Sequence, residues 1–198
     1  MTLSRAVLIW AGVALAILVP SAFALTSPLL QWRDPVYIIA GFAGVVGMAL
    51  LLLQPLLVGG HLPGLGAMRG RRMHRVVGAA LVLAVLIHVA GLWITSSPDV
   101  IDALLFVSPT PFAIWGVVAM WAIIGAAVLA AMRRRIGLRL RLWRFAHTVL
   151  AAVIVVGTVV HALLIDGTME SVTKAVLAAL LGAATLKVVI DLRAWAFR

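Results

Sequence analysis

Two stretches of sequence decide the fold of this chain: RMHRVVGAALVLAVLIH at residues 72–88 and RFAHTVLAAVIVVGTVVH at residues 144–161. Each is an apolar run that begins with arginine and holds two histidines fourteen residues apart. The four histidines are His74, His88, His147 and His161. A histidine inside a membrane span is costly and marks a functional site by default. Two runs with the same pair spacing therefore predict one common purpose for all four imidazoles.

The spacing places both histidines of a run on nearly the same side of a helix. Fourteen residues of α-helix rise about 21 Å and turn about 1400°, roughly 40° short of four full turns. If the two helices run in the same direction and face each other, His74 meets His147 at one depth and His88 meets His161 at another. Imidazole is an axial ligand of haem iron, so each pair can hold one haem from both faces. The sequence thus predicts two haems stacked across a bilayer.

The composition predicts an all-α integral membrane protein. Of the 198 residues 65% are hydrophobic, and the mean hydropathy is +1.20, more apolar surface than a soluble domain can bury. Six apolar runs lie near the ~20 residues needed to cross the hydrocarbon core, which predicts a six-transmembrane-helix bundle. They span residues 6–25, 36–58, 74–95, 112–132, 146–165 and 173–192. We expect one domain over residues 1–198, with the first run retained as a helix because it lacks a clear signal-peptide cleavage pattern.

The charge and the cysteine count narrow the possible functions. The chain has no cysteine, which excludes disulfides, iron–sulfur clusters and covalently attached c-type haem, so any haem is held without thioether links. The net charge of +10 comes largely from arginines that lie before the first run, after the sixth, and between runs two and three and runs four and five. The positive-inside rule then places both termini in the cytoplasm. We therefore expect a multi-pass protein of the cell inner (plasma) membrane, with the lipid bilayer and not nucleic acid as its charged partner.

Two connections between the runs carry further predictions. Ser97-Pro98-Asp99 can start a short helix, and the apolar residues up to Val107 are too few to span the membrane. This outer segment is either a lid over the outer haem or an amphipathic loop at the headgroups. The glycine-rich segment 59–66 follows a membrane helix and lacks the dinucleotide-binding spacing, so we expect no FAD or NAD(P) site in this chain. His61, which lies in it, is interpreted as a surface or structural residue.

Residues near the histidines predict how a haem is held. Four arginines lie close in sequence to His74 and His147, the histidines nearer the cytoplasmic ends of their runs, and each can form two parallel hydrogen bonds to a haem propionate. They are Arg71, Arg72, Arg75 and Arg144, and the sequence does not choose among them. Weaker candidates for the outer propionates are Arg33, Thr95, Ser96 and Ser97. Glycines also lie one helical turn from three of the four ligands. They are Gly78, Gly91 and Gly157, and beside the histidines we favour room for the haem ring over ordinary helix packing.

Other uses of membrane histidines fit less well. A proton relay or a metal transporter needs acidic or thiolate side chains near the histidines within the membrane. The only acidic residue in the apolar runs is Asp191, which lies at the end of a span. A zinc site needs ligands three or four residues apart on a helix, not fourteen. A haem-free transporter or scaffold stays open as a function from another class.

Several motifs together resemble one known family. They are Arg72-Met73-His74-Arg75, Leu86-Ile87-His88, Ser108-Pro109-Thr110-Pro111-Phe112, Leu142-Trp143-Arg144-Phe145-Ala146-His147 and Val160-His161. Over about residues 36–165 the chain is similar to the ferric reductase-like transmembrane domain, the membrane core of ferric reductases, NADPH oxidases and the haem subunit of the periplasmic methionine sulfoxide reductase system. The resemblance implies two b-type haems, the inner held by His74 and His147 and the outer by His88 and His161. It also implies electron transfer from the cytoplasmic side to an acceptor outside.

The resemblance further implies an oxidoreductase component that needs a separate electron donor. Complete enzymes of the family carry a C-terminal flavin and nicotinamide domain, and we expect no such domain in this chain of 198 residues. We expect a cytoplasmic flavin reductase or quinol as the donor, and ferric iron, oxygen or a periplasmic protein as the acceptor. The alternative is a membrane haem subunit that docks and reduces a periplasmic oxidoreductase such as a methionine sulfoxide reductase.

Overall fold

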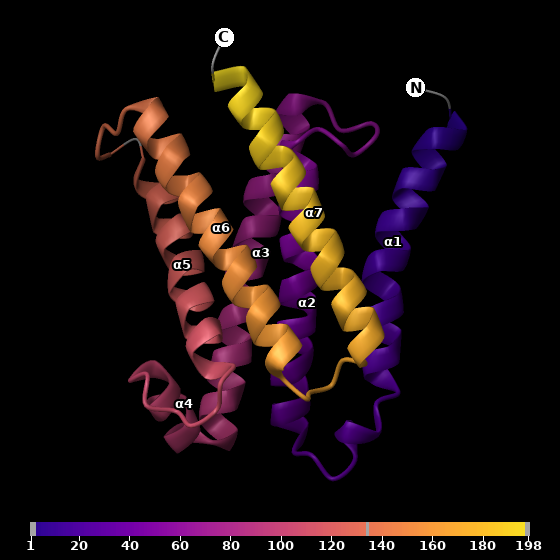
Figure 1. Cartoon of the computed structure of the whole chain (residues 1–198), viewed down its shortest axis with the longest axis vertical. Coiled ribbons are helices and arrows are strands. Elements are labelled where there is room, and N and C mark those ends of the chain that lie inside the picture. The colour runs from indigo at the N-terminus through magenta and orange to yellow at the C-terminus, as the bar shows by residue number, and fades with distance from the viewer. Residues whose placement is uncertain (1–2, 134, 197–198) are drawn as a thin grey trace.

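The computed structural model describes residues 3–133 and 135–196, which form helices joined by short connections (Figure 1). The elements are α1 (Leu3–Leu25), the 3₁₀ turn η1 (Pro28–Leu30), α2 (Pro35–Val58), α3 (Ala67–Thr95), α4 (Ser97–Leu104), α5 (Ala113–Met132), α6 (Leu140–Leu164) and α7 (Ser171–Ala196). Six of them, all but η1 and α4, are long and apolar enough to cross a membrane. The predicted all-α, six-helix membrane architecture is therefore confirmed.

The helices alternate in direction, which places the arginine-rich connections at one end of the bundle. Figure 1 shows the start of α1, the end of α7 and the α2–α3 and α5–α6 connections at the same end. The α1–α2 connection, α4 and the α6–α7 connection lie at the other end, called the outer end below. Since α3 and α6 both begin at the arginine-rich end, they run in the same direction, as the histidine argument requires. That this end faces the cytoplasm remains a prediction.

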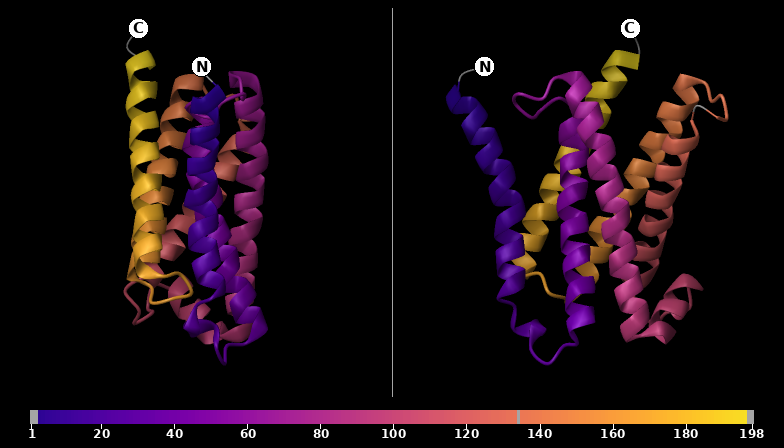
Figure 2. Two further views of the ribbon diagram at one scale, coloured as in Figure 1. Left: turned by 90° about the vertical axis from the view of Figure 1, so that its right-hand side faces the viewer. Right: turned by 180° about the vertical axis from the view of Figure 1, so that it is seen from behind.

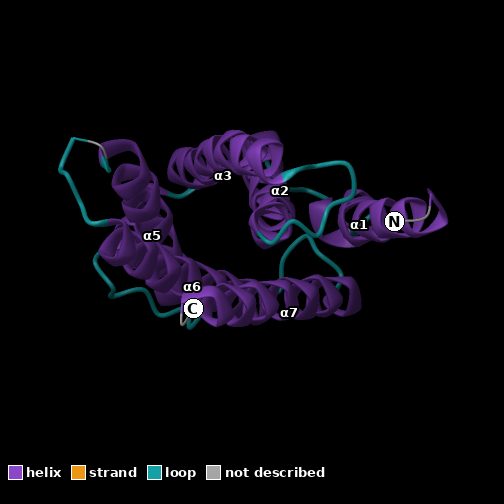
Figure 3. Ribbon diagram, turned by 90° about the horizontal axis from the view of Figure 1, so that it is seen from above, coloured by secondary structure: helices purple, strands orange, loops and turns teal. Residues whose placement is uncertain are grey.

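Two antiparallel helical hairpins, α2–α3 and α5–α6, form the body of the bundle. Seen from above, the two hairpins lie on opposite sides of the bundle (Figure 3). Helix α7 packs against α2 and α6. Leu177 and Leu181 of α7 are 1% and 0% exposed, in one apolar cluster with residues of α2, α3, α5 and α6. Helix α7 therefore packs into the apolar core of the bundle. At the edge of the bundle, α1 packs against α7 and α2, and Trp10 donates a hydrogen bond to the Pro63 carbonyl oxygen in the α2–α3 connection (Figure 2).

Glycines let the two helices of each hairpin approach closely. A Cβ built on Gly91 would lie 2.7 Å from the Cβ of Ala40, and one built on Gly157 would lie 2.9 Å from the Trp115 carbonyl oxygen. Neither position has room for a side chain. The small residue therefore permits close backbone contact, as glycine commonly does between membrane helices.

Helices α3 and α6 begin well before the apolar runs that predicted them. The basic segments at their starts continue the helix because arginine is a good helix former whose charge can stay at the headgroups. The predicted short outer helix also exists, as the eight residues of α4 between α3 and α5. Helix α4 exposes the apolar residue Ile101, and the turn after α4 exposes Leu105 and Phe106. Phe106 has a φ of 60°, which ends the helix sharply.

Candidate functional site

The structure brings the four predicted histidines together in the two predicted pairs. The imidazole centroids of His74 and His147 lie 6.2 Å apart, with an angle of 74° between the ring planes. Those of His88 and His161 lie 6.4 Å apart, at 84°. In each pair one ring comes from α3 and the other from α6, so each pair joins the two hairpins. The structure thus contains two separate levels of facing imidazoles.

The separation within each pair fits two ligands on opposite sides of one metal ion. With metal–nitrogen distances of about 2.0–2.1 Å and ring nitrogens about 1.1 Å from the centroid, such imidazoles have centroids about 6.3 Å apart. Both pairs match this value. Among the described residues no three His, Asp or Glu side chains converge, so the histidines do not belong to a conventional site of three or four protein ligands. Paired imidazoles at this distance fit a haem with two axial histidines.

At the outer level both imidazoles are held by backbone carbonyls. Nδ1 of His88 lies 2.7 Å from the carbonyl oxygen of Ala40, and Nδ1 of His161 lies 2.9 Å from that of Phe112. A carbonyl only accepts, so Nδ1 carries the proton and donates it in both rings. The other nitrogen, Nε2, then keeps its lone pair free for a metal. This arrangement is the usual one that orients a ligating histidine.

A glycine lies against each outer imidazole. A Cβ added to Gly44 would lie 3.1 Å from Nδ1 of His88, and one added to Gly116 would lie 2.7 Å from Nδ1 of His161. Each glycine stands four residues after the residue whose carbonyl accepts the bond. Neither glycine was predicted to contact a histidine, because the expected small residues lie on the helices that carry the histidines, whereas Gly44 and Gly116 lie on the other helix of each hairpin.

At the inner level the imidazoles are held differently. Nδ1 of His74 and Nδ1 of His147 are buried and have no hydrogen-bond partner within the described part of the chain. The backbone of Gln54 lies beside His74, but the geometry falls short of a hydrogen bond. His147 instead stacks on Trp143, with centroids 5.2 Å apart and planes 10° apart. The guanidinium of Arg133 lies 4.7 Å from the centre of the Trp143 ring.

Gln54 also carries a buried polar atom without a partner among the described residues. Its Nε2 makes no hydrogen bond. It lies 3.6 Å from the place of a Cβ on Gly78, one turn of α3 beyond His74. Unpartnered buried donors call for an explanation, and a polar group of a bound cofactor is one. This donor at the inner level was not anticipated from the sequence.

The interpretation of three glycines as room for a haem ring is wrong for two of them. Gly91 and Gly157 face the partner helix of their own hairpin, where a side chain would meet Ala40 or the Trp115 backbone. Gly78 also faces α2, beside Gln54. The reason is physical: the hairpin neighbour packs closer to these helices than the opposite hairpin does.

The candidate propionate partners are placed less specifically. Arg72, Arg75 and Arg144 have exposed side chains, and none has a hydrogen-bond or ion-pair partner among the described residues. At the outer end the predicted groups serve local contacts. Arg33 lies over the ring of Tyr37, Thr95 bonds to the Gly91 carbonyl, and Ser96 bonds to Asp99.

A buried cation at the outer end was not anticipated. Lys174 is 5% exposed, and its Nζ donates to the carbonyl oxygen of Ile165, 2.7 Å away. Ile165 caps the C-terminus of α6, one turn beyond His161, so the ammonium lies at the negative end of that helix dipole.

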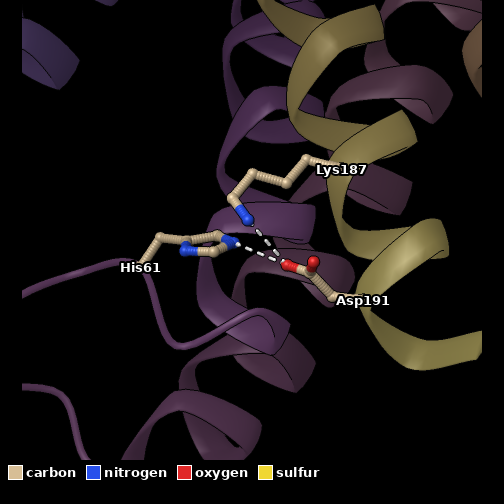
Figure 4. A network of polar contacts seen from close by, with 3 residues as sticks. All are labelled: His61, Lys187 and Asp191. Carbon is tan, nitrogen blue, oxygen red and sulfur yellow. Dashed lines mark hydrogen bonds and ion pairs between the residues drawn. The ribbon is translucent and has the colours of Figure 1, made fainter. Parts of the chain in front are cut away.

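His61 contacts Asp191, which also contacts Lys187, and it belongs to neither imidazole pair (Figure 4). Its Nε2 is 3.9 Å from Oδ2 of Asp191, an oxygen that also accepts a hydrogen bond of 2.8 Å from Nζ of Lys187. The contact ties the α2–α3 connection to α7, which agrees with a structural role.

The fold and the two imidazole pairs define an integral membrane protein with a transmembrane site built from paired histidines. Residues 40–158 match the model of the family described as "Ferric reductase like transmembrane component", and the chain belongs to this family. The match includes His74, His88 and His147 and ends three residues before His161. The family generally binds haem and supports a role in membrane electron transfer. Comparisons with curated proteins and with solved structures found no match.

Proposed function

We propose that this protein carries electrons across a membrane through two b-type haems, each held by one imidazole pair. The observation that supports this function best is the separation of 6.2 Å and 6.4 Å between facing rings at two levels. His74 and His147 would hold the inner haem, and His88 and His161 the outer one. The fourteen-residue spacing places the levels about 21 Å apart along the helices.

The chain contributes binding and orientation, while bound haem supplies one-electron redox chemistry. Held by two imidazoles, each haem would be better suited to electron transfer than to reaction of a small molecule at the iron. The carbonyls of Ala40 and Phe112 orient the outer rings. Trp143 orients His147 at the inner level. The cations nearest in sequence to His74 and His147 would bind the propionates of the inner haem. They are Arg71, Arg72, Arg75 and Arg144.

The charge distribution supports a direction. The arginine-rich end would face the cytoplasm of the inner (plasma) membrane and receive electrons from a flavin reductase, or from quinol in the bilayer. The outer end would deliver them to ferric iron, oxygen or a periplasmic protein. In this proposal the chain is a component of an oxidoreductase and its donor is a separate molecule.

A second function is favoured by the surface of α4 and the turn that follows it. Ile101, Leu105, Phe106 and Val107 are between 41% and 65% exposed at the outer end. In this alternative they dock a periplasmic oxidoreductase, such as a methionine sulfoxide reductase, which then takes the electrons directly. Reoxidation of the reduced protein by ferric chelates, oxygen or candidate periplasmic proteins, compared side by side, separates the two functions.

Reconstitution into vesicles tests electron transfer itself. Vesicles holding a trapped ferric chelate receive dithionite outside, a reductant that does not cross the bilayer. The proposal predicts reduction of the trapped chelate by vesicles with wild-type protein or with His61→Ala, and little reduction by vesicles with His74→Ala or His88→Ala. If the two paired-histidine variants transfer electrons as fast as His61→Ala, the proposed path through the imidazole pairs is wrong.

A further inference from the structure

The two levels of imidazoles are held by different means, and the difference has an electronic consequence. We propose that the outer site has the lower reduction potential of the two, because both of its imidazoles donate Nδ1–H to backbone carbonyls and neither inner imidazole does. The inference rests on the proposed function, since it assumes that each pair holds a haem. The inference adds which of the two haems has the higher reduction potential, because ligation by histidine alone does not determine this.

At the outer level the two bonds act on both faces of the site. His88 donates to Ala40 over 2.7 Å, and His161 donates to Phe112 over 2.9 Å. An acceptor at Nδ1 draws the proton away from the ring, so Nε2 becomes a stronger electron donor to a metal. A stronger donor stabilises the ferric state relative to the ferrous state and lowers the potential. Since both ligands are affected, the two contributions have the same sign.

At the inner level this contribution is weaker. The backbone of Gln54 lies beside His74 without the geometry of a hydrogen bond, and His147 has no backbone acceptor among the described residues. Nδ1 of His74 and of His147 are buried without a partner among the described residues, and His147 is oriented by its stack on Trp143. An imidazole without an acceptor is the weaker donor of electron density. The inner site therefore stabilises the ferrous state more than the outer site does.

The charges at the two ends act in the same direction. The inner level lies at the end that carries Arg72, Arg75 and Arg144, and positive charge favours the reduced, more negative state. The outer connections carry carboxylates. They are Asp34, Asp99, Asp102, Asp166 and Glu170. Two cations oppose these carboxylates at the outer end. Arg33 lies over the ring of Tyr37, and the ammonium of Lys174 is bonded to the carbonyl oxygen of Ile165.

The order of potentials has a functional meaning. An electron that enters the chain rests at the inner level, and the outer level is occupied only as an acceptor withdraws the electron. The membrane potential, negative inside, favours the outward step and can offset the difference. The arrangement would limit loss of electrons to adventitious oxidants when the acceptor is absent.

Potentiometric titration of the haem absorption tests the order. His147→Ala retains only the outer haem and His161→Ala only the inner one, so each variant assigns one of the two steps in the wild-type titration. The inference predicts that the haem in His161→Ala titrates at the higher potential. Gly44→Ala and Gly116→Ala push the outer rings off their carbonyls and should raise the lower step towards the upper one. Gly12→Ala and Gly182→Ala are matched controls, because nothing lies within 4 Å of a Cβ at either position.

The outcomes separate this inference from the function on which it rests. Three results would overturn the proposed order of potentials without affecting the proposal of two haems. They are two titration steps at the same potential, the outer haem at the higher potential, and a shift of the upper step in Gly44→Ala. Wild-type protein without haem, or histidine variants that keep both haems, overturns the proposed function as well. Should Gly116→Ala fail to fold, the milder contact of 3.1 Å at Gly44 and the wild-type titration still decide the order.

Discussion

The imidazoles of His88 and His161 face each other with centroids 6.4 Å apart, and each is held from behind by its own hairpin partner. The carbonyl that accepts from Nδ1 stands four residues before a glycine in both hairpins, at Ala40 and Gly44 in α2 and at Phe112 and Gly116 in α5. The two hairpins therefore repeat one local arrangement without a recognisable sequence repeat. Such a preformed site orients both ligands before a cofactor arrives.

Replacing single histidines should remove haems one level at a time. His74→Ala or His147→Ala should lower the haem content from two per chain to one by loss of the inner haem, and His88→Ala or His161→Ala by loss of the outer haem. The reason is that one imidazole cannot hold the ring against exchange when the opposite ligand is gone. A pyridine haemochrome assay measures the content.

The control for this series is His61→Ala, which should retain both haems because His61 contacts Asp191 and no paired histidine. A variant at one level whose remaining spectrum matches that of a variant at the other level would show that the pairs are assigned wrongly.

Trp143 should strengthen haem binding at the inner level only. Its stack on His147 is worth about 0.5–1.5 kcal/mol beyond area burial, so Trp143→Ala should weaken the inner haem roughly 2- to 13-fold. Trp143→Phe, which keeps an aromatic face, should recover most of the loss. Transfer of haem to a soluble acceptor protein measures the release of each haem. Equal release from Trp143→Ala and from the exposed-site control Trp93→Ala would contradict this role.

The start of α7 should make the stability of the protein depend on acid pH. The backbone N–H groups of Thr173 and Val172 hold the pKa of the Glu170 carboxyl below its ordinary value of 4.5. Both bonds are 2.8 Å long and cap the helix. A lowered pKa means that the stabilisation is present above the ordinary value and is lost as the pH falls through the folded-state value.

Thermal unfolding in detergent at a series of pH values measures this contribution. The difference in melting temperature between wild type and Glu170→Ala should be largest near neutral pH and shrink in acid. A difference that stays constant from neutral pH down to pH about 3 would contradict the cap as its source.

The orientation of the bundle is testable because the chain has no native cysteine. Cysteine placed at the exposed position Gln31 should react with a membrane-impermeant maleimide in cells whose outer barrier is permeabilised. Cysteine at the exposed position Arg135, in the arginine-rich α5–α6 connection, should react only after the inner membrane is opened. The reverse labelling would place both termini outside.

The sequence was sufficient for the spans and for the pairing of histidines. The histidines of 74–88 and 147–161 have the same spacing, and the six-span topology makes their helices parallel. Only one pairing then joins histidines at the same depth, and the structure shows that pairing, His74 with His147 and His88 with His161. The starts of α3 and α6 were missed because hydropathy detects the hydrocarbon core, whereas a helix continues into the basic segment beyond it.

The surroundings of the imidazoles were harder to predict. Every residue has a backbone carbonyl, so the sequence does not reveal that the carbonyls of Ala40 and Phe112 accept hydrogen bonds from histidine. Gly116 acquires its role only through the register of an antiparallel hairpin, forty-five residues from His161. Gly157 lies one turn before the same histidine but faces the hairpin partner. Proximity in sequence therefore pointed to the wrong glycine.

The haem content and spectrum of the purified wild-type chain measure whether each imidazole pair holds an iron. We expect two b-type haems per chain by pyridine haemochrome, with the absorption of six-coordinate low-spin iron in both redox states. A colourless protein, or one with high-spin haem that binds carbon monoxide readily at both sites, would contradict the claim that each pair of facing imidazoles holds an iron between them.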